Sequence, residues 1–204
     1  MSAATMHSES KHKLILASGS PQRRRLMTDA GYRFEVVVPG EHAECGPDAG
    51  EPPVDYAARM AYQKAADVVD RVPAGVVIAC DTIVACRGEI LGKPADAADA
   101  RRMLSVLSGQ VHHVYSGLCV WLRPDGQAAI RTAETRLVMN RLSSEVMEEY
   151  LASGAWAAKA GAFGYQDRHG WLQVVEGSES NVIGLPMELL AEMLTAIGLP
   201  PWPV

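Results

Sequence analysis

A short polar turn early in the chain could bind a phosphate group. Residues 14–27 read LILASGSPQRRRLM, so an apolar run meets Ser20 and Pro21 and then three arginines. Serine followed by proline is typical of a helix start, where free backbone N–H groups and the helix dipole favour an anion. Arg23 would lie in the first helical turn and could add a two-pronged hydrogen bond. The alternative is that these arginines are solvated on a surface helix, and this stretch alone leaves both open.

A single carboxylate interrupts an apolar run in the middle of the chain. The run GVVIACDTIVAC covers residues 75–86, and Asp81 is its one charged residue. A carboxylate in a buried strand is costly unless it is paired or binds a metal. A magnesium ion bridging Asp81 and phosphate oxygens would account for it, and the alternative is a carboxylate that caps nearby backbone amides. Lys93 follows a glycine-marked hairpin and could fold back near Asp81, although alone it reads as a surface lysine.

A third segment, WAAKAGAFGYQ at residues 156–166, crowds small residues around Lys159 and Gln166. Gly161 and Gly164 would allow the backbone to approach a ligand closely. The Gln166 side chain carries both a donor and an acceptor, so it could read the edge of a base. The alternative is a tightly packed bend with no ligand.

The elements that must position these residues alternate between strand and helix. Periodicity and turn signals predict strands over residues 13–17, 33–38, 75–86, 111–123, 128–139 and 171–175. Cap and stop signals predict helices over residues 21–31, 54–70, 97–108, 143–154 and 186–198. Residues 39–53 and 176–185 read as polar connections. The predicted order of elements combines hairpins with alternating strands and helices. This order indicates an α/β protein with a mixed sheet.

Composition limits the kinds of partner. The chain has 204 residues, 48% of them hydrophobic, with a net charge of −5 and a pI near 5.7. This balance argues against a nucleic-acid polymer as partner, because such binding depends on many basic contacts to phosphate. The longest apolar stretch is too short to span a membrane. Residues 1–12 have no apolar signal-peptide core, so we expect a disordered tail on a cytoplasmic protein.

The four cysteines and the neighbouring histidines at 112 and 113 do not form metal-binding patterns. Cys45, Cys80, Cys86 and Cys119 include no C-x-x-C pair, and three of them lie in apolar runs. We therefore expect buried free thiols rather than disulfides or a zinc site. The two histidines stand at the head of a predicted strand, where a structural role is the usual one, and the alternative is that one of them faces a ligand cleft.

Five segments in this order closely resemble the Maf family of nucleoside triphosphate pyrophosphatases. They are LILASGSPQRRRLM, ARMAYQKA, the stretch from CDTIVAC to HHVYSG, KAGAFGYQ and VIGLP, and the resemblance spans residues 13–197. It implies one domain over residues 13–204, with an elongated mixed sheet, flanking helices and two lobes around a central cleft, as in inosine-triphosphate pyrophosphatases. It also implies a homodimer that hydrolyses nucleoside triphosphates to monophosphate and pyrophosphate with a divalent metal, removing non-standard nucleotides.

The resemblance assigns roles position by position. The implied catalytic residues are Asp81, Lys64, Lys93 and Arg23, and the implied substrate-binding residues are Ser20, Gln22, Lys159 and Gln166. Asp81 and Glu44 are the implied ligands of a Mg²⁺ ion, with Mn²⁺ and Co²⁺ as alternatives. Asp81 could be a metal ligand, a general base or both.

Two departures from the family pattern affect these assignments. Many members have arginine where this chain has Gln22, which leaves the preferred base open between pyrimidines and 7-methylguanine; the segment around Lys159 favours the dTTP/UTP branch. The family commonly has an Asp-Glu pair after the second strand, whereas this chain has Glu41 and Glu44 without an acidic neighbour. We take Glu44 as the metal-shell carboxylate.

A different function class is a non-catalytic protein that senses nucleotides and is linked to cell-division arrest. A sensor could bind nucleotide without the metal carboxylate, so the presence of Asp81, Lys64 and Lys93 favours catalysis. A nucleic-acid-binding module is disfavoured by the acidic charge and by an aromatic content of 6%.

Overall fold

The fold is a mixed α/β arrangement, as the sequence predicts. The structure is a computed structural model that describes residues 13–124, 126–167 and 169–199; the predicted tail at residues 1–12 lies outside them. The strands are β1 (Leu14–Leu16), β2 (Phe34–Val36), β3 (Gly75–Cys86), β4 (Glu89–Leu91), β5 (Val111–Arg123), β6 (Ala128–Met139) and β7 (Leu172–Glu176). The helices are α2 (Pro21–Asp29), α3 (Pro53–Val69), α4 (Ala97–Leu107), α5 (Ser144–Ala152), α6 (Glu179–Ile183) and α7 (Met187–Ala196). Three single 3₁₀ turns are η1 (Glu41–Ala43), η2 (Ala160–Ala162) and η3 (Tyr165–Asp167).

The seven strands found in the described residues belong to one sheet. Its order is β2-β1-β3-β5-β6-β7, and β4 pairs with β3. β1 runs parallel to both β2 and β3, with Leu14 opposite Phe34 on one side and Val76 on the other. The pairs β3–β4 and β6–β7 are antiparallel. The sheet is therefore mixed, which confirms the predicted fold class.

The chain divides into two compact units. The first contains the chain up to Asp81, Ser116–Ala133 and the chain from Gly184 onward, and the second contains Thr82–Tyr115 and Glu134–Ile183. The long strands β3, β5 and β6 each contribute residues to both units.

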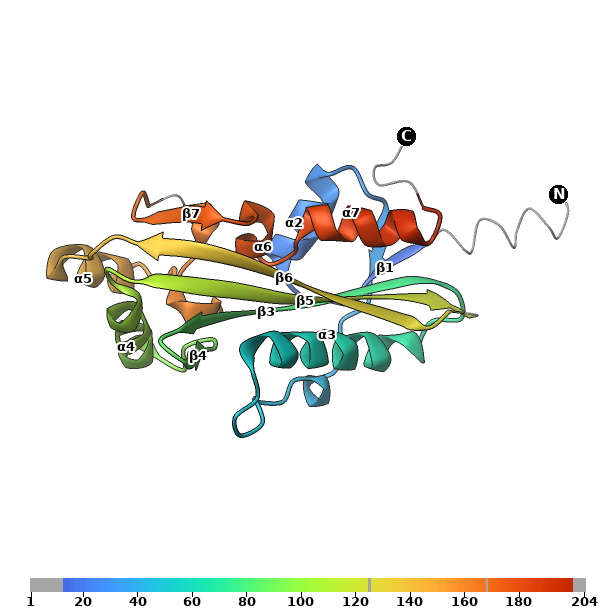
Figure 1. The fold of residues 1–204 in the computed structure, drawn as a ribbon, viewed down its shortest axis with the longest axis horizontal. Helices are drawn as coiled ribbons and strands as arrows, with labels where there is room; N and C mark the ends of the chain where they lie inside the picture. The colour runs from blue at the N-terminus through green and yellow to red at the C-terminus, as the bar shows by residue number, and fades with distance from the viewer. Residues whose placement is uncertain (1–12, 125, 168, 200–204) are drawn as a thin grey trace, which may run out of the picture. The chain divides into compact units, whose positions relative to one another are not determined.

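In the first unit, helices cover both faces of the sheet. Figure 1 shows α3 on one face, with α2 and α7 on the other. The α3 face buries alternate strand residues such as Ile15 and Val77 against helix residues such as Ala61. The opposite face buries the other strand residues, such as Leu16 and Ile78, against α2 and α7. The period of two in each strand therefore gives each helix layer its own core.

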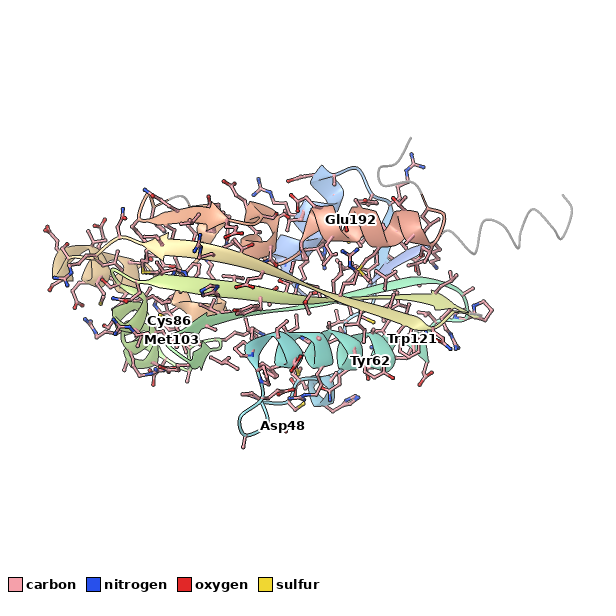
Figure 2. All side chains as sticks on the ribbon, in the orientation of Figure 1. Asp48, Tyr62, Cys86, Met103, Trp121 and Glu192 are labelled. Carbon is pink, nitrogen blue, oxygen red and sulfur yellow. The ribbon has the colours of Figure 1, made fainter. Side chains whose placement is uncertain are left out.

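α3 approaches β5 closely because of one glycine. A Cβ at Gly117 would lie 2.1 Å from the carbonyl oxygen of Ala57 in the first turns of α3, so only glycine fits there. Further along the same helix, the ring of Tyr62 stacks on that of Trp121, with centroids 5.6 Å apart and an interplanar angle of 17°. Both aromatic side chains are labelled in Figure 2.

The second unit has a core of its own. It packs apolar residues of α4 and α5 against the ends of β3, β5 and β6 that belong to this unit, with Phe163 and Trp171 completing the cluster. His112 is fully buried on β5, and its ring meets that of Phe163 edge to face, with centroids 5.5 Å apart. The predicted structural role for this strand histidine therefore agrees with its burial.

Most predicted elements are present, and the differences lie in short segments. The expected helix start at Ser20 is confirmed, and the predicted helices over residues 97–108 and 143–154 begin at N-caps formed by Asp96 and Ser143; each of the three side chains accepts a hydrogen bond from a backbone N–H in the first turn. The prediction of a plain polar connection before the last helix is wrong, because α6 forms there. This helix spans five residues, too few for an amphipathic period to be visible in the sequence.

The thiol prediction is confirmed for three cysteines and wrong for the fourth. All four thiols are free; Cys80, Cys86 and Cys119 are buried, whereas Cys45 is exposed. Cys45 lies in the polar connection before α3, outside the apolar runs, which accounts for its exposure. None of the helices in the described part of the chain has the length and hydropathy needed to cross a bilayer.

Candidate active site

The turn between β1 and α2 is built as a helix start. Ser20 is the N-cap residue and Pro21 takes the first helical position, and the Arg23 backbone N–H donates to Ser20 Oγ at 3.5 Å. The Ser20 N–H itself donates to the hydroxyl oxygen of Ser18, which is buried, at 3.1 Å. The Ser20 hydroxyl donates to Gln22 Oε1 at 3.1 Å. The turn thus gathers hydroxyls, backbone N–H groups and the positive end of the α2 dipole.

Two acceptors orient the side chain of Arg23. Its Nε donates to the carbonyl oxygen of Gly184 at 2.8 Å, and its Nη1 donates to Ser18 Oγ at 3.3 Å. The same Gly184 carbonyl accepts from the Cys80 thiol at 3.3 Å, so the guanidinium is tied to the residue next to Asp81 through one oxygen atom. The alternative of a solvated arginine is wrong for Arg23, which is half-buried, and holds for Arg24 and Arg25, which are exposed.

Three charged residues of the first unit, Glu44, Lys64 and Asp81, meet at β3. This strand pairs with β1, which leads into the turn. Lys64 is 6% exposed on the sheet-facing side of α3, and its Nζ lies 2.5 Å from Asp81 Oδ1 and 3.0 Å from Glu44 Oε1. The side chain of Asp81 is 15% exposed and that of Glu44 is 52% exposed. Asp81 is therefore paired with a lysine, and the alternative of a carboxylate that only caps backbone amides is wrong.

Two of these side chains suit a hard divalent cation. Across the described residues, no group of three or more His, Cys, Asp and Glu side chains could hold a metal ion. Asp81 and Glu44 nevertheless turn one oxygen each toward a single ammonium group, so two carboxylates converge on one positive charge. Magnesium in proteins is usually held by one or two carboxylates together with substrate phosphates, so this pair fits such an ion.

In the second unit, a bend brings Lys159 against an acidic residue that the sequence analysis missed. Lys159 Nζ pairs with Asp167 Oδ2, and both side chains are mostly buried. Gly164 makes this possible, because a Cβ there would lie 2.6 Å from Lys159 Nζ and 2.4 Å from Asp167 Oδ2. Gln166 is half-buried in η3. The sequence gives no signal for the pair beyond the position of Asp167 next to Gln166.

The loop that carries Lys93 is attached to the same bend. The Gly161 N–H donates to the carbonyl oxygen of Gly92 at 3.0 Å, directly before Lys93, which is exposed. Gly161 has a φ of 67°, a left-handed conformation that favours glycine. Lys93 and Lys159 thus come from segments joined by a backbone hydrogen bond.

Comparison with known proteins identifies the family. A family model described as Maf-like protein matches residues 13–197. The chain belongs to this family. A dTTP/UTP pyrophosphatase of Rhodopirellula baltica is 49% identical over 92% of this chain and 83% of its own length. Proteins with the same name from Geotalea uraniireducens and Sphingopyxis alaskensis are 41% and 42% identical, over 93% and 92% of this chain and 97% of each relative. The predicted resemblance is confirmed.

Among solved structures, a HAM1 protein from Coxiella burnetii aligns with 91% of this Maf-like chain and 99% of its own, at 14% identity and a TM-score of 0.48.

The nine predicted site residues of this Maf-like protein divide between the two units. Six of them belong to the first unit: Ser20, Gln22, Arg23, Glu44, Lys64 and Asp81. The other three belong to the second: Lys93, Lys159 and Gln166. The groups that orient these side chains were not predicted from the sequence: they are Ser18 and Gly184 for Arg23, and Asp167 for Lys159. Ser18 lies inside the quoted segment LILASGSPQRRRLM, and Gly184 lies inside VIGLP. Their place in these segments was the one sign in the sequence that they could belong to the site.

Proposed function

We propose that this Maf-like protein hydrolyses nucleoside triphosphates to nucleoside monophosphate and pyrophosphate, with dTTP and UTP as its preferred substrates. Its relatives named dTTP/UTP pyrophosphatase align over more than nine-tenths of the chain. The observation that carries the proposal is the contact of Lys64 with both Glu44 and Asp81 in a chain of this family. An enzyme with this pyrimidine preference would also remove non-standard nucleotides of the same type, such as 5-methyl-UTP and pseudouridine triphosphate.

The reaction breaks one phosphoanhydride bond. A water oxygen attacks the α-phosphorus, the new P–O bond forms as the bond to the bridging α–β oxygen breaks, and pyrophosphate leaves. Most of the rate gain in such chemistry comes from positioning and from stabilising charge on the phosphate oxygens. The backbone turn at Ser20 and the guanidinium of Arg23 would hold phosphate oxygens. Lys64 and Lys93 would add positive charge along the triphosphate.

Asp81 and Glu44 would hold a divalent cation, Mg²⁺ with Mn²⁺ or Co²⁺ as alternatives. When bound, such an ion supplies positive charge to phosphate oxygens and lowers the pKa of a coordinated water. The carboxylate of Asp81 is also a candidate to accept the proton of the attacking water, because its pairing with Lys64 keeps it oriented.

Gln22, Lys159 and Gln166 would bind the substrate. The Gln166 amide can donate and accept at once, which suits the edge of uracil or thymine. Lys159 is held by Asp167 and would contact the nucleotide next to Gln166. The central cleft, the homodimer, the cytoplasmic location and the absence of a nucleic-acid polymer partner stay predictions.

The test is hydrolysis of a panel of triphosphates: dTTP, UTP, CTP, GTP, 7-methyl-GTP, 5-methyl-UTP and pseudouridine triphosphate. Each is assayed for phosphate with and without inorganic pyrophosphatase, in Mg²⁺, Mn²⁺ or Co²⁺. We expect phosphate only when pyrophosphatase is present, with dTTP and UTP turned over fastest. Phosphate without the added enzyme would mean γ-phosphate cleavage and would contradict the proposal.

The matched variants are Asp81→Asn and Asp29→Asn. Asp81→Asn should lower kcat by about 10³-fold because it removes a charge aimed at the reacting groups. Asp29 is an exposed carboxylate paired with Arg25, so Asp29→Asn should leave the rate unchanged. Near-normal turnover by Asp81→Asn would exclude the role given to Asp81. Nucleotide binding without hydrolysis by the wild type would favour the sensor.

A further inference from the structure

The loop that carries Glu44 is attached to α3 on both sides of that residue. On the N-terminal side, Asp67 accepts the Gly40 N–H at 3.0 Å and pairs with His42 Nε2 at 2.7 Å. On the C-terminal side, the guanidinium of Arg59 donates to Cys45 Sγ and to the carbonyl oxygen of Gly46, each at 3.0 Å. Glu44 therefore lies between two attachments to one helix.

The Arg59 attachment is anchored by a two-pronged ion pair. Arg59 Nε lies 2.7 Å from Glu51 Oε1, and its Nη2 lies 2.6 Å from Glu51 Oε2. The side chains are 25% and 11% exposed, so the pair is partly shielded from solvent. Glu51 Oε2 also accepts the Asp48 N–H at 3.0 Å, which closes the loop; Asp48 is labelled in Figure 2. The hydrogen bond from Arg59 is the main reason that the pKa of Glu51 falls to about 2.

A second side chain of α3 supports the same stretch of loop. The Tyr56 hydroxyl donates to the carbonyl oxygen of Cys45 at 3.0 Å, and the Arg59 guanidinium lies 5.4 Å from the Tyr56 ring centroid. Tyr56 and Arg59 are three residues apart, so they lie on the same face of the helix. The residue directly after Glu44 is thus held through its carbonyl oxygen and its thiol.

Glu44 itself needs such support. Its side chain is 52% exposed, so burial does not orient it, yet its carboxylate reaches Lys64 Nζ at 3.0 Å. Lys64 and Arg59 lie on the same helix, five residues apart. A loop tied to that helix keeps the distance from Glu44 to Lys64 constant, whereas a loose loop would let the carboxylate sample solvent.

We propose that Arg59, acting through Glu51, is a positioning residue that holds Glu44 beside Lys64 and Asp81 for cation binding. The inference rests on the proposed function for the use of the cation, while the positioning itself is a property of the loop. Groups that orient metal ligands typically change metal affinity 10- to 100-fold when removed.

The test uses Arg59→Lys and Glu51→Gln, each of which keeps size and loses the two-pronged contact, together with the double variant. Arg101→Lys is the matched control, because Arg101 makes the same kind of two-pronged contact with Glu148 on exposed helix surfaces of the other unit. We measure hydrogen exchange of residues 41–51, and Mn²⁺ binding by electron paramagnetic resonance with an α,β-non-hydrolysable UTP analogue present. In the hydrolysis assay, the half-saturating metal concentration is measured separately from KM for UTP.

We expect each single variant to raise the Mn²⁺ dissociation constant about tenfold and to speed exchange of the loop by a similar factor, with KM for UTP changed less than about twofold. The double variant should bind Mn²⁺ no more weakly than either single variant, because both substitutions remove the same contact between Arg59 and Glu51. Unchanged Mn²⁺ binding, or an equal loss in Arg101→Lys, would overturn the proposal. A wild type that hydrolyses no nucleotide would contradict the proposed function alone, since Mn²⁺ binding and exchange would still decide the role of Arg59.

Discussion

The ammonium group of Lys64 lies 2.5 Å from a carboxylate oxygen of Asp81, and both residues interrupt apolar patterns. Lys64 stands on the buried face of α3 among alanines, and Asp81 stands in the middle of β3. Either charge alone in such surroundings would cost several kcal/mol, so each residue is the reason the other is tolerated.

Removing one partner should destabilise the fold more than removing both charges. Lys64→Met leaves the Asp81 carboxylate without its main partner and should lower the free energy of unfolding by about 3 kcal/mol. The double variant Lys64→Met/Asp81→Asn should recover most of that loss, although both variants should be inactive. Urea denaturation at pH 7 measures the difference. A double variant less stable than Lys64→Met would contradict the pairing.

His112 should make the protein less stable in mild acid. Burial lowers the pKa of His112 to about 4 from an ordinary value of 6.5. Between these values the unfolded chain binds a proton that the folded chain does not, so stability falls as the pH falls through this window. The loss between pH 7 and pH 5 should be about 2 kcal/mol from this residue.

The measurement is urea denaturation at both pH values for the wild type and His112→Phe, which keeps an aromatic ring against Phe163. The variant should lose about 2 kcal/mol less than the wild type over this range. Parallel losses in the two proteins would show that His112 does not titrate in this window.

Gly164→Ala should weaken substrate binding with little effect on stability. The added Cβ would meet the ends of the Lys159 and Asp167 side chains, which can move at low cost because both are flexible. We expect kcat/KM for UTP to fall by about 10- to 100-fold, since small misplacements at a site cost that much, while the melting temperature changes little. Retained kcat/KM would mean that Lys159 does not contact substrate.

Gly117→Ala should impair folding. Its Cβ would lie 2.1 Å from a backbone oxygen of Ala57, which cannot move without shifting α3. Overpacking against backbone costs about 3 kcal/mol, so the variant should unfold at markedly lower urea concentrations. Gly92→Ala is the control, because its Cβ would meet no atom within 4 Å. Equal unfolding curves for Gly117→Ala and the wild type would exclude a close approach of α3 to β5.

Local patterns in the sequence predicted most elements, because they depend on neighbours along the chain. The predicted strands over residues 75–86, 111–123 and 128–139 match β3, β5 and β6 at both ends. Serine, aspartate and proline at helix starts act within one turn, so the starts of α2, α4 and α5 were predictable as well. α6 was missed because five residues are too short to carry a period.

The quoted segments by themselves determined the family and the fold class, and they supplied the candidate site residues. Contacts between elements were decided only by the tertiary structure, for example the bond from Arg23 to Gly184, which are 161 residues apart. The tertiary structure also decided that Lys159 pairs with Asp167 and that Arg59 attaches the Glu44 loop to α3. The physical reason is that periodicity defines which face of an element is buried, whereas side-chain contacts depend on how the faces of separate elements meet.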